Sequence, residues 1–356
     1  MAVLAHETGH VVGGHLARLK ETMRIAQRTT LLTSILGGIA AVASQRPDVG
    51  VAVMVGSQGS IMGSVSTYRI SEENSADKIA VDLLIKTNQS LKGMVDIMKL
   101  LDKESRLYPD YEFEYYRTHP ITGDRIAFFE NMYEKHKDLK VNQEYEVKFS
   151  RIKAKLFAFL GDKERVYNIV KGRKDIDSLY ALAIYYLRIN NVDNAIKTID
   201  MVISIEPNNP YFYELKGQIY FENGKIKESI APYKKALSLK PDNNLIITML
   251  SMAELEEGSN NDLKQISESL AKVVIKEKYD PFIWRIYASC YKRLKDEAKY
   301  SYGMAEYNFL VGNNEIALYH ANKALKDVGE GTPMWFNIQD IISTINDSNK
   351  NKKGDL

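Results

Sequence analysis

"PNNPYFYELKGQIYFENGKIKESIAPYKKALSLKPDN", residues Pro207–Asn243, decides the fold of much of this 356-residue chain. Its apolar and small residues recur at helical spacing, and the stretch predicts two helices joined by a turn. Pro241 ends the second helix, because the residue before a proline does not easily stay helical.

The same pattern recurs along the chain with a period of 34, which is the period of the tetratricopeptide helix-turn-helix. Small residues recur where the two helices of a unit cross, and a large side chain there would push the helices apart. The matching positions are Ala183, Gly217 and Ser251; Pro207 and Pro241; Tyr186 and Tyr220; Ala195 and Ser229.

The repeats become less regular at both ends. The first has Val202 where the second has Ala236, a degenerate third spans roughly 244–280, and a fourth is indicated by Ala305, Ala317 and Ala324. The alternative is a helical bundle without a solenoid.

Composition excludes several classes of protein. The formal net charge is +2 and no Lys/Arg-rich cluster stands out, so nucleic-acid binding has no electrostatic support. A single cysteine, Cys290, excludes an intrachain disulfide framework. The sequence does not begin with a basic segment followed by an apolar one, so we expect no export signal in the chain as written.

We expect an all-α protein with several parts. Residues 1–145 are expected to form one domain and 146–175 a helical connector. A tetratricopeptide solenoid is expected over 176–345, followed by a disordered tail over 346–356.

The block 29–67 is small, apolar and divided by Arg46 and Asp48 into uncharged runs of 17 and 19 residues. These runs approach transmembrane length, but the second is rich in glycine and polar residues. We interpret the block as a helical hairpin or lid beside the active site, with membrane-surface contact; the alternative is true insertion. Residues 1–28 are expected to form one helix.

"VLAHETGHVVGG", residues 3–14, contains the pattern H-E-x-x-H. In a helix His6 and His10 lie one turn apart on the same face, so both rings can reach one zinc ion. Glu7 would be turned away from the metal and could act as general base on an attacking water.

A third ligand is offered by "SEENSADKIAVDLL", in which Glu73 is followed one turn later by Asp77. Glu73 would complete a set of two histidines and one glutamate, as in the Glu-zincins, for one Zn²⁺ per chain. Asp77 would accept a hydrogen bond from a ligand histidine and fix its tautomer. Glu72 is the alternative ligand.

Two further histidines are candidates for a role near the metal. His15 lies about 140° round the helix from His10, so we predict a structural or hydrogen-bonding role for it. His119 precedes Pro120, which we expect at the first position of a helix. The aromatic segment before His119, residues 108–118, is expected to be flexible. We predict that His119 acts at the metal site; the alternative is that it is only a structural residue at the start of a helix.

"VLAHETGHVVGGHLARL", "ENSAD" and "YRTHPITGDRI" occur in this order and resemble the family of integral and periplasmic zinc endopeptidases, which includes the CAAX prenyl protease and HtpX. The added repeats are similar to those of its periplasmic, BepA-like (beta-barrel assembly-enhancing) branch. The resemblance implies a zinc metalloendopeptidase that acts on unfolded or stalled outer-membrane proteins. It also implies a periplasmic location and a His-Pro loop, here His119–Pro120, that lies over the zinc.

Family members carry an export signal and a further α/β portion before the H-E-x-x-H helix, so the resemblance implies that an N-terminal portion is missing here. The competing hypothesis is therefore a catalytically inert, truncated binding protein with a chaperone-like solenoid.

The repeats are expected to dock substrates or the outer-membrane assembly machinery through their concave groove. The expected groove residues are Tyr180, Arg188, Tyr211 and Gln218.

Overall fold

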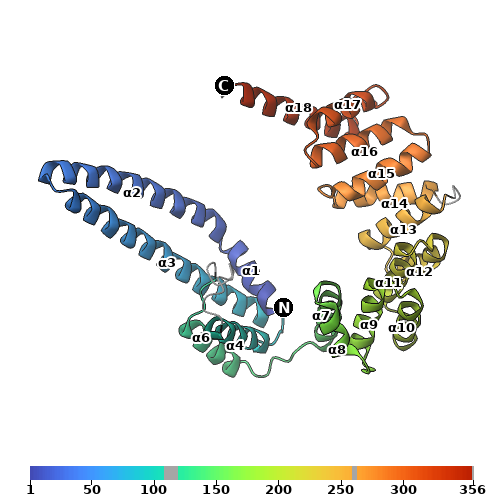
Figure 1. Ribbon diagram of the computed structural model, residues 1–356, viewed down its shortest axis with the longest axis horizontal. Coiled ribbons are helices and arrows are strands. Elements are labelled where there is room, and N and C mark those ends of the chain that lie inside the picture. The colour runs from blue at the N-terminus through green and yellow to red at the C-terminus, as the bar shows by residue number, and fades with distance from the viewer. Residues whose placement is uncertain (108–118, 259–262, 355–356) are drawn as a thin grey trace. The chain divides into compact units, whose positions relative to one another are not determined.

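The structure is a computed structural model that describes residues 1–107, 119–258 and 263–354. Every regular element in these ranges is an α-helix, which confirms the all-α prediction (Figure 1). The chain divides into two compact units, Met1–Phe149 and Ser150–Leu356, which are described separately.

The first unit is built on a small apolar core at the base of two long helices. Ala80, Leu84, Met94 and Phe129 are buried together in this core. Its helices are α1 (Ala2–Val12), α2 (His15–Ser44), α3 (Pro47–Lys86), α4 (Lys92–Leu107) and α6 (Gly123–Lys135). The core therefore fixes α1 against α3, with α4 and α6 beside them.

The expectation of one helix over residues 1–28 was wrong, because the helix is broken between α1 and α2. Gly14 has φ = +65°, a left-handed conformation that side-chain-bearing residues rarely adopt. The chain changes direction there, and α2 begins at His15.

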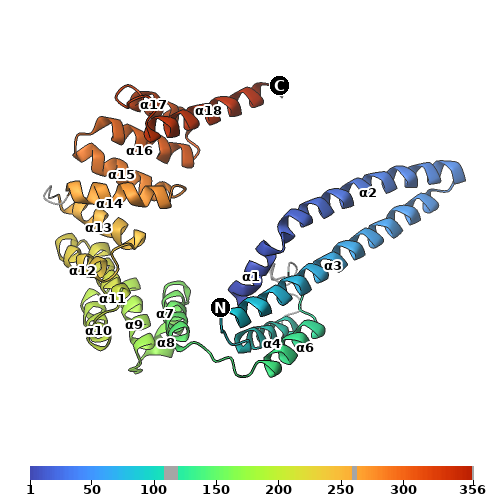
Figure 2. The ribbon, with the colours of Figure 1, turned by 180° about the vertical axis from the view of Figure 1, so that it is seen from behind.

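Helices α2 and α3 form a long antiparallel hairpin, as expected for residues 29–67. Its arms extend away from α1, α4 and α6 in both views (Figures 1 and 2). Near the tip the two backbones approach closely: a Cβ added to Gly50 would lie 2.6 Å from the carbonyl oxygen of Gly37. Both helices are long and apolar enough to cross a membrane, by length and composition only.

Most of the large apolar side chains of the hairpin point outward. Those that are more than one-third exposed include Leu31, Leu32, Ile35, Leu36, Ile39, Val42, Val51, Val53, Val55 and Met62. Gly37 and Gly50 thus face the partner helix while most of the large apolar residues face the surroundings.

The second unit stacks helices in antiparallel pairs (Figure 1). They are α7 (Gln143–Leu160), which begins before the unit boundary, α8 (Lys163–Val170), α9 (Ile176–Arg188), α10 (Val192–Ile205), α11 (Pro210–Glu222), α12 (Ile226–Leu239), α13 (Asn244–Glu257), α14 (Leu263–Lys276), α15 (Pro281–Arg293), α16 (Glu297–Leu310), α17 (Asn314–Ala324) and α18 (Pro333–Gly354).

The small residues of the repeats lie where the sequence places them. Ala183 is fully buried, and a Cβ added to Gly217 would lie 2.6 Å from the ring of Tyr233 on the partner helix. Gly303 makes the same close approach to Tyr287. The periodic small positions therefore set the distance between the helices of each pair.

The expectation that residues 346–356 form a disordered tail was wrong as far as Gly354, because helix α18 continues to that residue. Ile338, Ile341 and Ile345 anchor the helix in the core of the second unit. Once a helix is nucleated by packing, each added residue gains one backbone hydrogen bond at little further cost.

Candidate metal centre

Side chains from α1 and α3 converge on one point. His6 Nε2 and His10 Nε2 lie 3.1 Å apart, because the two residues are one helical turn apart on α1. From α3, Glu73 Oε1 lies 3.1 Å from His10 Nε2 and Glu73 Oε2 lies 3.3 Å from His6 Nε2. The structure thus brings together the three residues predicted as metal ligands.

His119 joins this group from the chain that leads into α6. Its Nδ1 lies 2.9 Å from Glu73 Oε1, and one ligand atom from each of the four residues falls within 4.8 Å of the others. Three imidazoles and a carboxylate form a donor set suited to a metal ion.

Gly9, within the H-E-x-x-H pattern, allows the convergence. A Cβ on Gly9 would lie only 2.6 Å from the carbonyl oxygen of Ala76 on α3. Any side chain there would push α1 away from α3 and carry His6 and His10 away from Glu73. Sequence analysis missed this role, since the need for glycine arises from the packing of the two helices.

Asp77 lies behind His6, as predicted. Its Oδ1 is 2.9 Å from His6 Nδ1, the nitrogen turned away from the convergence point. Asp77 is itself held by Arg125, whose Nε and Nη2 donate to its two carboxylate oxygens at 2.6 and 2.9 Å. This contact can fix the ring of His6 with Nε2 directed at a metal.

Arg125 was missed by sequence analysis, although it lies in the quoted stretch "YRTHPITGDRI". Its Nη1 lies 2.9 Å from Glu73 Oε2 and donates to the carbonyl of Pro120 at 2.7 Å. The side chain is 3% exposed. One buried guanidinium therefore links Glu73, Asp77 and the His119–Pro120 segment, and a buried charge of this kind is stable only because it is fully paired.

The expectation that Pro120 opens a helix was wrong. Helix α6 begins at Gly123, and Thr122 is its N-cap, accepting a hydrogen bond from the backbone N–H of Arg125. His119 lies before this cap, in a segment without regular structure. The expected flexible segment 108–118 lies outside the described residues.

At both His6 and Glu73, burial and the neighbouring charged groups shift the pKa in opposite directions, and the neighbouring groups have the larger effect. Burial alone would lower the pKa of His6, but the carboxylates of Asp77 and Glu73 outweigh it and raise that pKa to about 9. Burial alone would raise the pKa of Glu73, but hydrogen bonds from three histidines and the charge of Arg125 hold it well below its usual range. Both shifts have the same cause, which is the close approach of carboxylates to the histidine rings.

Glu7, the predicted general base, is exposed on α1 next to His6. It makes no contribution to the group of converging ligand atoms. This agrees with a side chain that reaches solvent near the metal and does not bind it.

His15 and Glu72 lie immediately outside the ligand set. His15 is 4% exposed, and its Nδ1 lies 2.8 Å from Nδ1 of His10. Glu72, the alternative ligand in the sequence, contacts His15 and Arg18 instead.

A cavity of about 250 Å³ opens beside the ligands. Its apolar wall is formed by Leu16, Leu19 and Tyr68 at the base of the hairpin, and Glu73 and His119 border it. A substrate side chain could enter there next to the metal position.

Two of the four expected groove residues are used inside the solenoid. Tyr180 is 2% exposed and packs against Phe212, with ring centroids 5.1 Å apart. Arg188 donates to the carbonyls of Ala158 and Gly161 at 2.7 and 2.8 Å. The expectation that they line an open groove was wrong, because Tyr180 is buried against Phe212 of the next repeat and Arg188 is bonded to the C-terminal end of α7.

The other two expected groove residues are accessible. Tyr211 is 40% exposed, and its hydroxyl accepts a hydrogen bond from Lys240. Gln218 donates to Glu222 at 2.7 Å. A docking surface, if formed by the second repeat, would use these two.

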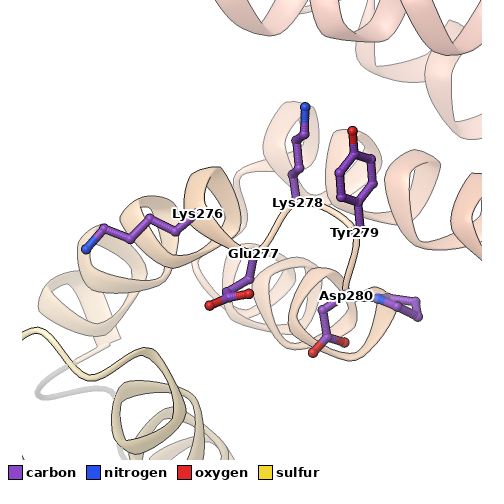
Figure 3. Close-up of a pocket in the computed structure, with 6 residues that line it drawn as sticks. Lys276, Glu277, Lys278, Tyr279 and Asp280 are labelled. Atoms are coloured by element: carbon purple, nitrogen blue, oxygen red, sulfur yellow. The ribbon is translucent and has the colours of Figure 1, made fainter. Parts of the chain in front are cut away.

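A second hollow, of about 350 Å³, lies at the turn between α14 and α15. Figure 3 shows Lys278 and Tyr279 on one side of this turn and Glu277 and Asp280 on the other. Asp280 caps α15 through the N–H of Phe282, and the Lys278 carbonyl accepts from the Trp284 indole at 2.9 Å. The polar groups here close a helix connection and do not converge on a ligand.

Comparison with known proteins agrees with both units. Residues 1–133 match Peptidase family M48, and residues 217–246 match a TPR repeat. The beta-barrel assembly-enhancing protease of Escherichia coli (strain K12) is 24% identical over 339 residues, covering 93% of this chain and 68% of that protein. The protein of the same name from Yersinia pestis is 24% identical over 263 residues, covering 72% and 53%.

Among solved structures, the type IV pilus biogenesis factor PilW is similar at a TM-score of 0.39 and 14% identity, over 56% of this chain and 100% of that one. This similarity is too low to carry an argument. From the sequence matches and the geometry of the site, the chain combines a peptidase family M48 domain with tetratricopeptide repeats and is homologous to the beta-barrel assembly-enhancing proteases.

Proposed function

We propose that this protein is a zinc-dependent metalloendopeptidase that hydrolyses peptide bonds of unfolded or misassembled outer-membrane proteins. The observation that carries the proposal is the convergence of His6, His10 and Glu73. A tetrahedral zinc with ligands at about 2.0–2.1 Å needs ligand atoms about 3.3 Å apart. The distances among these three residues are 3.1, 3.1 and 3.3 Å.

His6, His10 and Glu73 would hold the zinc, which when bound would polarise the substrate carbonyl and lower the pKa of water. Glu7 would remove a proton from the attacking water and return it to the departing amine. Asp77 and Arg125 would keep the ligands in place.

His119 supplies a further nitrogen at the same point, so it can control the site. A neutral His119 ring can occupy the coordination position that a catalytic zinc keeps open. Moved away from the metal, the same ring can donate a hydrogen bond to the oxyanion that forms during attack. We favour the blocking role, since His119 Nδ1 already lies 2.9 Å from Glu73 Oε1.

The proposed substrate and location rest on the relatives and on the family resemblance. The relatives' name refers to assembly of beta-barrels, and members of the BepA-like branch work in the periplasm. The solenoid would dock substrate or assembly partners through the accessible face that carries Tyr211 and Gln218.

The hairpin fits contact with a membrane at residues 29–67. Its outward Leu, Ile and Val side chains face the surroundings on both arms, and its helices meet through Gly37 and Gly50. Close approach at small residues is how helices associate in lipid, where large apolar side chains gain nothing by facing each other.

The test is metal content together with hydrolysis of an unfolded beta-barrel protein. We expect about one zinc per chain, and cleavage that is abolished both by a chelator and by Glu7→Gln, with zinc retained in Glu7→Gln. Zinc-free protein that binds the unfolded substrate without cleaving it would support the inert binding protein instead.

His119→Ala separates the two roles of that residue. Zinc should stay bound, because three ligands remain. A rise in proteolysis indicates that His119 blocks the site, and a fall of about 10²–10³-fold indicates oxyanion stabilisation. Rate and zinc affinity both equal to wild type would reduce His119 to a structural residue.

A further inference from the structure

His10 is contacted by a second imidazole on the side away from the ligand group. His15 Nδ1 lies 2.8 Å from His10 Nδ1, within hydrogen-bond distance. The rings stand nearly perpendicular, with centroids 4.9 Å apart. His15 is 4% exposed, and it is absent from the converging ligand atoms.

The far side of His15 meets a carboxylate. Its Nε2 lies 3.1 Å from Glu72 Oε2, at ion-pair distance although outside hydrogen-bond geometry. Arg18 Nη2 donates to both oxygens of Glu72, at 3.2 and 3.0 Å. Adjacent residues of α3 thus serve different histidines: Glu73 faces the ligand rings, and Glu72 faces His15.

Two glycines make this arrangement possible. In an unbroken helix His15 would point away from His10, whereas the left-handed turn at Gly14 brings it back. A Cβ on Gly13 would lie only 2.2 Å from His15 Nε2. The space that the ring of His15 occupies therefore exists only because residue 13 has no side chain.

The contacts define the direction of the hydrogen bond between the two rings. With Nε2 of His10 directed at the metal position, the proton of its neutral ring is on Nδ1, and Nδ1 can only donate. His15 Nδ1 then accepts, so the proton of His15 is on Nε2, which faces Glu72.

We propose that His15 and Glu72 are positioning residues for His10, fixing its tautomer and ring orientation through a histidine–histidine–glutamate series. The inference rests on the proposed metal site. It makes the two ligand histidines unequal: His6 is oriented directly by Asp77, whereas His10 is oriented by Glu72 only through His15.

The experiment measures the zinc dissociation constant by competition with a chromophoric chelator, for Glu72→Gln, His15→Ala and the double variant. Loss of an outer partner of a metal ligand typically costs 10–100-fold in metal affinity. We expect a loss in this range for each single variant, and no further loss when Glu72→Gln is added to His15→Ala. Glu21→Gln is the matched control, since Glu21 pairs with Arg24 on the same helix, away from the ligands.

The helical signal and thermal unfolding of each chelator-treated variant show whether it is folded. If His15→Ala does not fold, Glu72→Gln alone decides, because it keeps the shape of the side chain. Unchanged affinity in Glu72→Gln, or additive losses in the double variant, would overturn the inference while leaving the zinc site standing. Wild-type protein that takes up no zinc would overturn the proposed function and this inference together.

Discussion

The two units distribute charge and apolar surface in opposite ways. The first buries His6, Glu73, Asp77 and Arg125 around one point. The second buries its large apolar residues, and its buried carboxylates are separate, as in the pair of Glu214 with Lys155. Converging buried charges weaken a fold unless each is paired, so their concentration in the first unit favours a functional site there, whereas apolar packing organises the second unit.

The two units also use the same packing device for different purposes. Glycines let helices approach at Gly37 and Gly50 in the hairpin and at Gly217 in the solenoid. In the solenoid the large apolar residues then fill the interior, whereas in the hairpin they face outward. Both units bring helices together at glycines. The large apolar side chains point inward in the solenoid and outward in the hairpin, which indicates that the two surfaces face different environments.

The largest difference between the two units is expected when a metal ligand is removed. His10→Ala should lower zinc affinity by more than the 10–100-fold that loss of an outer partner costs. Metal analysis and chelator competition measure this loss. The unfolding transition of the solenoid should not move, and full zinc occupancy in His10→Ala would contradict the ligand assignment.

Gly217→Leu should destabilise the solenoid and leave zinc binding unchanged. The new side chain has to displace the ring of Tyr233, and overpacking of this kind costs about 3 kcal/mol in the free energy of unfolding. Denaturant unfolding measures the loss, and zinc affinity should stay at the wild-type value. Gln218→Leu, at the neighbouring half-buried position, is the control and should be nearly neutral.

The hairpin should respond to its surroundings more than to its own packing. Leu32→Ser with Leu36→Ser removes two outward apolar side chains, each worth about 1.5 kcal/mol when buried in hydrocarbon. Binding to phospholipid vesicles should fall about a hundredfold, with thermal stability in water unchanged. Equal vesicle binding by variant and wild type would count against membrane contact.

Gly37→Leu and Gly38→Leu form a matched pair on the same arm. A Cβ on Gly37 would lie 2.8 Å from Met54, whereas Gly38 has nothing within 4 Å. The yield of chemical cross-links between α2 and α3 should therefore fall in Gly37→Leu and stay at the wild-type value in Gly38→Leu.

The smallest effect concerns pH and the solenoid. Burial raises the pKa of Glu306 to about 7, against opposing contacts with Tyr302 and Lys278. Because the folded state holds this proton more tightly, its stabilising effect is complete below pH 4.5 and is lost as pH rises through 7. Glu306→Gln should remove this loss, a gain on the order of 2 kcal/mol at pH 8 and little at pH 4.5. Equal gains at both pH values would assign the effect to packing.

The sequence by itself determined what depends on local periodicity. A spacing of four residues places His6 and His10 on one face of any helix, and Glu73 and Asp77 follow the same rule. The period of 34 places Ala183 and Gly217 at equivalent crossings, because each repeat packs against its neighbours in the same way.

Only the tertiary structure decided contacts between segments that no period relates. Arg125 reaches Asp77 across 48 positions, and Tyr180 is buried against Phe212 of the next repeat. The turn at Gly14 brings His15 back to His10, where an unbroken helix would have separated them. These contacts depend on how helices pack and where the chain turns, and a helical repeat carries no information about either.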